Sequence, residues 1–163
     1  MSTRSGFKND AGGQSPCVEG KAPVVERLQE RLFRADNDTI RAARRFVREA
    51  ARTTALDPVR LSDIELAASE LVTNAIEHGS GEAYRVRVVI EDDRFVVEVS
   101  SKHCGEPISP PSMWGVGRSD ELTGRGLGLV KAVSTETWIE QSHDELLVGC
   151  AFISLDSVNT SLL

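Results

Sequence analysis

The chain is poor in cysteine, in basic residues relative to acidic ones, and in long apolar runs. Its three cysteines, Cys17, Cys104 and Cys150, are widely spaced and form no Cys-x-x-Cys pair or Cys/His ligand set, which argues against a disulfide framework or a structural zinc site. No apolar run approaches the roughly 18–20 residues that cross a bilayer, and the polar start of the chain is not a signal-peptide core. We therefore expect a soluble, cytoplasmic protein with no membrane segment.

The charge balance is acidic. Nineteen Lys and Arg residues stand against twenty-five Asp and Glu residues, which gives a net charge of -6. Such a balance argues against sequence-independent binding to nucleic acid. Five arginines fall between Arg41 and Arg52, but a run of this kind usually forms the solvated face of a helix. We expect no nucleic-acid partner.

The composition divides the chain into a tail and one domain. Residues 1–22 combine glycine, serine, asparagine and proline with few apolar residues, a composition that cannot offset the entropy of ordering the chain. The rest is long enough and apolar enough to form one compact core. We predict a disordered N-terminal tail over residues 1–22 and a single domain over residues 23–163.

Two helices are predicted in the first half of the domain. Asp36 and its neighbours supply N-cap side chains for a helix that runs to about Thr54. The capping box Ser62-Asp63-Ile64-Glu65 predicts the start of a second helix, which Gly79 ends. The segment from Val24 to Arg34 fits either a helix or a short edge strand, and its pattern does not decide between them.

Strands and a long irregular segment follow. Tyr84–Ile90 and Arg94–Ser100 are rich in β-forming residues and are separated by a three-residue acidic turn, so they predict an antiparallel hairpin. Residues 101–121 contain several prolines and glycines. An irregular loop of this length is unusual in a small domain unless it has a function such as a lid.

The last third of the chain predicts a helix and a second hairpin. The helix extends from Leu127 to about Thr135, and the strands cover Trp138–Ser142 and Leu146–Leu155. Trp138 and Phe152 are candidates for the core. The order of elements indicates an α+β fold, a two-layer sandwich in which helices cover one face of an antiparallel or mixed, mostly antiparallel, sheet.

Glu70 and Asn74 form the first candidate site. Four residues turn an α-helix through slightly more than one turn, so both side chains project from the same face of the second helix. In a polar cavity, the carboxylate of Glu70 could accept a proton and the amide oxygen of Asn74 could bind a hard cation. The alternative is an ordinary polar pair on a solvated helix face.

The segment Gly124-Arg125-Gly126-Leu127-Gly128-Leu129 forms the second candidate site. Glycines where a loop enters a helix let backbone N–H groups approach an anion, which the helix dipole favours, and Arg125 could pair with a phosphate. The alternative is a hinge or a close helix–sheet contact. The segment matches neither the P-loop nor the dinucleotide-binding pattern, because no Gly-Lys-Ser/Thr follows it and no parallel βαβ unit surrounds it.

The chain resembles the GHKL ATPase superfamily, whose members share the Bergerat fold. The resemblance rests on four features and on their order along the chain: the Glu-x-x-x-Asn helix, the hairpin, the long loop and the glycine segment. The chain is most similar to its small anti-sigma-factor serine/threonine kinases. That resemblance extends over residues 35–155 and is carried by three segments: Ala43-Arg44-Arg45-Phe46-Val47-Arg48, Ser69-Glu70-Leu71-Val72-Thr73-Asn74-Ala75 with His78, and Gly124-Arg125-Gly126-Leu127-Gly128-Leu129-Val130.

The resemblance implies a site and partners. Glu70 would be the catalytic general base toward a serine hydroxyl or water, and Asn74 would bind the Mg²⁺ that bridges the ATP phosphates. The segment Gly124-Arg125-Gly126-Leu127-Gly128 would hold those phosphates, with residues 112–123 as a lid. The partners would be a sigma factor, an anti-anti-sigma protein of the STAS type, or both, and members of the family often form homodimers.

The chain departs from the family pattern where the adenine base is recognised. The family usually ends the second strand of the first hairpin with an Asp that accepts a hydrogen bond from the adenine amino group, and Ser101 aligns with that Asp. Losing a charge-assisted hydrogen bond of about 1.5–3 kcal/mol implies a ten- to hundredfold loss of affinity. Ser101 therefore favours an alternative, a non-catalytic module that sequesters its partner without nucleotide. Gly149-Cys150 is a second departure, because the family tends to have Gly-Thr there.

Overall fold

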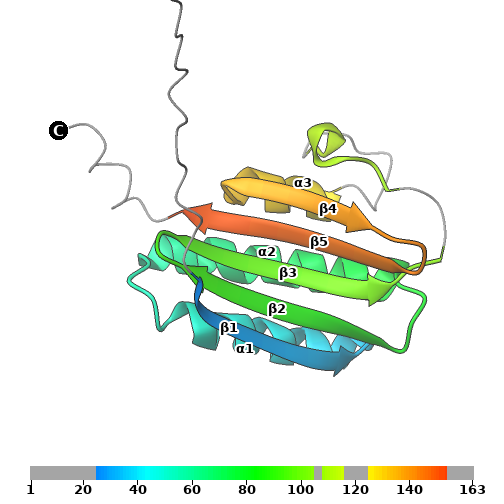
Figure 1. The fold of residues 1–163 in the computed structure, drawn as a ribbon, viewed down its shortest axis with the longest axis horizontal. Helices are drawn as coiled ribbons and strands as arrows, with labels where there is room; N and C mark the ends of the chain where they lie inside the picture. Colours follow the sequence, from blue (N-terminus) through cyan, green and yellow to red (C-terminus); the bar gives the residue numbers. More distant parts are fainter. Residues whose placement is uncertain (1–24, 105–107, 116–124, 154–163) are drawn as a thin grey trace, which may run out of the picture.

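A five-stranded sheet forms one layer of the protein and three α-helices form the other (Figure 1). This computed structural model describes residues 25–104, 108–115 and 125–153; the predicted tail, residues 1–22, lies outside these ranges. All four pairings of neighbouring strands are antiparallel. The expected α+β sandwich is confirmed, and its sheet is antiparallel, which was one of the two expected sheet types. The strand order is β1 (Val25–Arg34), β2 (Ala83–Glu91), β3 (Arg94–Lys102), β5 (Glu145–Ile153), β4 (Glu136–Gln141).

The segment that fitted either a helix or a strand is β1, an edge strand that pairs with β2. Over residues 27–34, the part of β1 whose side chains the structure describes, one large side chain is buried in the core: Phe33 stacks on Tyr84 of β2 with 5.5 Å between the ring centroids. Leu28 and Leu32 are exposed. An edge strand with so little buried surface shows no clear apolar alternation, which explains why its pattern was ambiguous.

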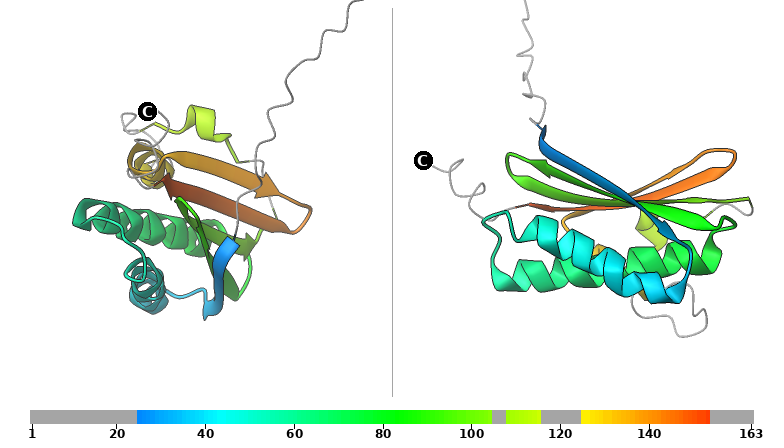
Figure 2. Two further views of the ribbon diagram at one scale, coloured as in Figure 1. Left: turned by 60° about the vertical axis from the view of Figure 1, so that its left-hand side comes forward. Right: turned by 90° about the horizontal axis from the view of Figure 1, so that it is seen from below.

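The helices are α1 (Ile40–Ala51), α2 (Pro58–His78) and α3 (Arg125–Val133), and all three lie on the same face of the sheet (Figure 2). Two short 3₁₀ turns, η1 (Asn37–Thr39) and η2 (Pro111–Met113), complete the described elements. The Asp36 cap belongs to η1, where its carboxylate accepts a hydrogen bond of 3.0 Å from the Asp38 N–H. The helix α1 follows η1 directly, with Thr39 as its N-cap, and it ends at Ala51, before the predicted Thr54.

The predicted start of α2 was wrong. The helix begins at Pro58, before the expected capping box, and Asp57 is its N-cap. The Asp57 carboxylate accepts hydrogen bonds from the N–H groups of Val59 and Arg60, at 2.8 and 2.9 Å. Proline suits the first helical position, because the N–H it lacks has no partner there in any helix. The predicted end holds, since α2 finishes at His78 and Gly79 is its C-cap.

The core lies between the sheet and the helices, and a smaller apolar cluster lies on the opposite face of the sheet. Phe152 belongs to the core, as expected. Trp138 does not, because it packs on the smaller cluster and covers Gly149, where a Cβ would overlap the indole ring. An unsubstituted backbone at position 149 is therefore what makes room for Trp138. Within the described residues, no helix is long and apolar enough to cross a membrane.

Candidate functional site

Two of the residues predicted from the sequence, Glu70 and Gly126, meet where α2 and α3 pack together. Glu70 comes from α2 and Gly126 from α3, and an ideal Cβ at Gly126 would stand only 2.6 Å from Glu70 Oε2. The Glu70 carboxylate thus occupies the space that a side chain at position 126 would need. Two segments far apart in the sequence are joined here through a contact that only glycine permits.

Asn74 lies one helical turn beyond Glu70 on α2, on the side toward the helix C-terminus. Its side chain is buried, with a relative exposure of 9%, and it makes no hydrogen bond to any residue in the described ranges. The amide is therefore free to bind water or a ligand. The amide oxygen is a suitable ligand for a hard cation.

Ser101 lies near the end of β3, close to the C-terminal end of α2. An ideal Cβ at Gly79 would stand 3.4 Å from the Ser101 hydroxyl oxygen. Ser101 is only 6% exposed, and its hydroxyl makes no hydrogen bond within the part of the chain that the structure describes. Ser101 and Asn74 are therefore two buried polar side chains that lack partners near the same end of α2.

The glycine segment begins α3. The helix starts at Arg125 among the described residues, earlier than the predicted Leu127, while Gly124 lies outside the described ranges. Arg125 is exposed, whereas Leu127 and Gly128 are buried. The Leu127 side chain packs in the core, so only its backbone could face a ligand. Arg125 is the one cation of this segment, and a phosphate group could reach it.

The first part of the predicted lid is attached to the body of the protein. Trp114 is buried in the core, and its indole N–H donates a hydrogen bond of 2.8 Å to the Ser109 carbonyl oxygen. Residues 112–115 of the predicted lid are described, and residues 116–123 lie outside the described ranges. Sequence reasoning missed the role of Trp114. A single tryptophan in a loop rich in proline and glycine was the available signal, because a large aromatic side chain gains most by burial.

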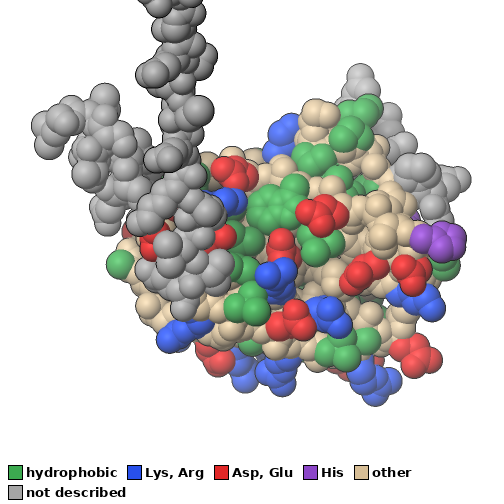
Figure 3. All heavy atoms as spheres, in the orientation of Figure 1, with side chains coloured by type: hydrophobic (Ala, Val, Ile, Leu, Met, Phe, Trp, Pro, Cys, Tyr) green, Lys and Arg blue, Asp and Glu red, His purple; other side chains and the backbone are tan. Residues whose placement is uncertain are grey.

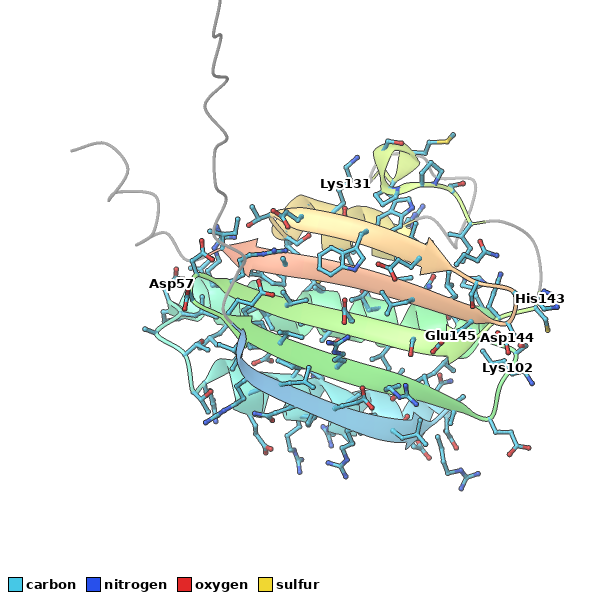
Figure 4. The ribbon with its side chains drawn as sticks, in the orientation of Figure 1. Asp57, Lys102, Lys131, His143, Asp144 and Glu145 are labelled. Carbon is cyan, nitrogen blue, oxygen red and sulfur yellow. The ribbon has the colours of Figure 1, made fainter. Side chains whose placement is uncertain are left out.

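Charged side chains gather at the end of the sheet where β3 finishes and β4 turns into β5. Lys102, Asp144 and Glu145 lie close together there, and Asp57 lies at the far end of the molecule (Figure 4). The His103 N–H donates a hydrogen bond of 2.8 Å to the Asp144 carbonyl oxygen, which ties the end of β3 to this turn. Ser101 thus lies in a part of β3 that is paired with β2 on one side and with β5 on the other.

A separate cavity of about 390 Å³ lies at the opposite end of the sheet, beside the turn between β2 and β3. Its lining includes Arg27, Thr53, Glu91 and Arg94, and none of the candidate site residues predicted from the sequence. In the described ranges, no group of three or more His, Cys, Asp or Glu side chains could hold a metal ion. A Mg²⁺ ion bound through Asn74 would therefore take most of its ligands from phosphate oxygens and water.

Comparison with known proteins defines the class. The family of histidine kinase-like ATPase domains matches residues 33–148, and the chain belongs to this family. The crystal structure of the RsbU and RsbW domains of Rv1364c from Mycobacterium tuberculosis matches with a TM-score of 0.58 and 20% sequence identity. The match covers 78% of this chain and 32% of that one, and at this identity it shows the shared fold. No curated protein sequence matches the chain. The superfamily inferred from the sequence is confirmed.

Proposed function

We propose that this protein is a cytoplasmic ATP-binding regulator of the anti-sigma-factor serine/threonine kinase type. The observation that carries the proposal is the pair of buried side chains, Asn74 and Ser101, that have no hydrogen-bond partner among the described residues. Both lie toward the C-terminal end of α2, on the same helix as Glu70. Neither side chain is engaged by another described residue, so both are open to a polar ligand, and ATPase domains of this family bind a nucleotide.

The residues present fit a nucleotide that extends along α2. Glu70 and Gly79 are nine residues apart, which is about 13.5 Å along the helix axis. Gly126 and Arg125 would receive the phosphates at one end of this span, and Ser101 would contact the base at the other. Asn74 lies between them, where its amide oxygen would hold Mg²⁺ against the phosphates.

Each residue then has a defined part in phosphate transfer. Glu70 would accept the proton of a serine or threonine hydroxyl from a partner protein. Asn74 would fix the cation, and the start of α3 would stabilise negative charge through its backbone N–H groups and Arg125. ATP, when bound, supplies the phosphoryl group. Because such transfer depends mainly on positioning and charge neutralisation, the close Glu70–Gly126 contact supports this assignment.

The proposed partners are a sigma factor and an anti-anti-sigma protein of the STAS type. Support comes from the family resemblance of the α1 and α2 segments and from the fold shared with a protein that contains an RsbW domain. In this arrangement, transcription is controlled by which partner the regulator holds, and phosphate transfer would alter the affinity of one of them.

A second candidate function is a non-catalytic binding module with the same fold. Ser101 favours it, because a neutral hydroxyl stands where the family usually has a carboxylate for the base. Such a module would hold its partner without nucleotide, and Glu70 and Asn74 would then have no chemical role.

Calorimetric titration with Mg-ATP separates the two candidates. We expect binding by the wild type, loss of binding in Asn74→Ala, and unchanged binding in Glu77→Ala, an exposed position on the same helix. If the wild type releases no heat up to millimolar ATP while Ser101→Asp binds, the non-catalytic module is the correct assignment.

Kinase activity needs its own assay. Phosphate transfer to a STAS-type partner should be lost in Glu70→Ala and retained in Glu77→Ala. Absence of transfer to the true partner, in a protein that binds Mg-ATP, would sink the kinase assignment and leave ATP binding in place.

A further inference from the structure

The cavity beside the turn between β2 and β3 lies between the two layers of the fold. Its volume of about 390 Å³ falls in the range of about 300–1,000 Å³ that is usual for small-molecule sites. Four strands of the sheet contribute to one wall, and residues 53–56, which connect α1 to α2, form the other. The turn and this connection lie at the same end of the molecule (Figure 1). The cavity is therefore separate from Glu70, Asn74 and Ser101.

The inner part of the cavity is apolar. Ile90, Phe95 and Phe152 line it and belong to the core, with exposed fractions of 8%, 2% and 0%. Leu56 lines the opposite wall, where it packs on the same core and stays partly exposed. Small-molecule sites typically combine such apolar walls with a few polar groups that fix the orientation of the ligand. We therefore expect a ligand with an apolar group.

The mouth of the cavity carries charges of both signs that do not pair with each other. Arg27 Nη1 donates a hydrogen bond of 3.2 Å to the Thr53 hydroxyl, which in turn donates to the Ala50 carbonyl oxygen at 2.7 Å. Arg27 forms no ion pair with a carboxylate in the described ranges. Asp92 and Asp93, in the turn, form no ion pair with a described cation either.

The other charges near the cavity are already paired. Arg94 lies 3.5 Å from Glu91 and 2.6 Å from Glu136. Figure 3 shows acidic and basic side chains mixed on the face of the sheet without helices, where Arg87 pairs with Glu98 at 3.3 Å. The charges that remain for a ligand are therefore the ones at the mouth of the cavity.

Strand geometry indicates the spacing of these charges. Arg27 is the register partner of Ile90, and Asp92 lies two residues beyond Ile90. Because neighbouring strands are about 4.8 Å apart and a strand rises about 3.3 Å per residue, the Cα atoms of Arg27 and Asp92 are roughly 8 Å apart. Both residues line the cavity. A small molecule between them can therefore contact a cation on one side and a carboxylate on the other.

We propose that this cavity binds a free α-amino acid with a large apolar side chain. Its carboxylate pairs with Arg27, its ammonium group pairs with Asp92 or Asp93, and its side chain occupies the apolar inner part. An apolar carboxylate would leave the aspartates unpaired, and an apolar amine would leave the arginine unpaired. A zwitterion uses both signs of charge, which is why we assign the cavity to an amino acid.

The first test compares ligands on the unmodified full chain. Calorimetric titration with L-phenylalanine should show saturable binding with a dissociation constant in the micromolar to low millimolar range. L-phenylalanine amide lacks the carboxylate and N-acetyl-L-phenylalanine lacks the ammonium group, so each should bind about tenfold more weakly or worse. Glycine, which keeps both charges but has no apolar side chain, should be weakened as much.

Two results of this titration overturn the proposal. One is the absence of saturable binding up to about 10 mM L-phenylalanine. The other is an analogue that binds as tightly as the amino acid, because equal binding of N-acetyl-L-phenylalanine would indicate a site for apolar carboxylates and equal binding of the amide a site for apolar amines.

The second test locates the ligand with variants. Arg27→Gln, and Asp92→Asn combined with Asp93→Asn, should each weaken L-phenylalanine binding about tenfold or more. Arg27→Gln should affect the amide much less, because the amide has no carboxylate to lose. Arg41→Gln is the matched control, at an exposed position of α1 outside the cavity lining, and should leave binding unchanged. Circular dichroism confirms that each variant is folded.

Methyl NMR spectra give an independent location. L-phenylalanine should shift the methyl signals of Leu56 and Ile90, which line the cavity, and leave those of Leu71, beside Glu70 on α2, in place. Binding that neither charge variant weakens, or shifts centred on Leu71, would rule out this cavity. Because the cavity shares no lining residue with the proposed nucleotide site, Mg-ATP binding can fail without affecting this result.

Discussion

The carboxylate of Glu70 on α2 lies against the backbone of Gly126 on α3, in the space that a Cβ at position 126 would occupy. The candidate base and the candidate phosphate segment are thereby in direct contact. Glycine at position 126 allows close packing and also leaves the backbone open to a ligand. The two predictions made for the glycine segment, an anion-binding site and a close packing contact, are therefore compatible at this residue.

Gly126→Ala is expected to separate folding from ligand binding. The added methyl group must displace the Glu70 carboxylate, which is the flexible end of a long side chain, and alanine is the better helix former by about 0.5–1 kcal/mol. The free energy of unfolding should therefore change by less than about 1 kcal/mol, while Mg-ATP affinity falls about tenfold. Urea unfolding and calorimetry measure the two effects. Gly115→Ala is the control, because nothing lies within 4 Å of its Cβ position.

Ser101→Asp should raise affinity for ATP and lower stability without it. A carboxylate at this position can accept a charge-assisted hydrogen bond from the adenine amino group, which predicts a ten- to hundredfold tighter complex. Without nucleotide, the same carboxylate is buried and unpaired, so the protein should lose about 1–3 kcal/mol of stability. Ser101→Ala controls for loss of the hydroxyl. Unchanged ATP affinity in Ser101→Asp would place the base elsewhere.

Gly149→Ala should destabilise the protein by about 1–3 kcal/mol, because the new methyl group overlaps the Trp138 indole. Chemical unfolding measures the loss, and tryptophan fluorescence should report displacement of the ring. The double variant Gly149→Ala with Trp138→Ala isolates the cause. If overlap with Trp138 is responsible, adding Gly149→Ala to Trp138→Ala should cost much less than adding it to the wild type.

Cys150 should make the protein sensitive to alkaline pH. Burial raises the pKa of its thiol from 9.0 to about 12. The unfolded thiol ionises above pH 9.0, and the folded thiol does not until about pH 12. Its contribution to stability is therefore complete below pH 9.0 and is lost between these two values. Urea unfolding across this range should show a steeper loss in the wild type than in Cys150→Ala.

Tyr84 does not confuse that comparison. Burial raises its pKa, partly offset by the hydrogen bond with Thr39, and the residue is present in both proteins. Thiol labelling provides a second check, because Cys104 is exposed and should react with reagent in the native state, while Cys150 is buried and should not. Equal slopes for the wild type and Cys150→Ala would contradict the assignment.

Local signals predicted much of the fold. The cap at Gly79 was placed correctly, and Asp36 does cap a helical turn, although that turn is η1 and not α1. Two segments near the start of α2 could cap it. The helix begins at Asp57 and Pro58 and not at Ser62, because the earlier start adds a turn to the helix. The contact between Glu70 and Gly126 was not predictable. Periodicity assigned each residue to a helix, but the distance between them follows from how two helices pack.

α2 also determines which parts of the site can change their separation. Glu70 and Asn74 are fixed to one rigid helix of 21 residues, so the spacing between the candidate base and the candidate cation ligand is constant. Gly126 and Ser101 come from other elements. A ligand can therefore enter between Glu70 and Gly126 when the Glu70 side chain turns away, while the backbone spacing of Glu70 and Asn74 stays the same.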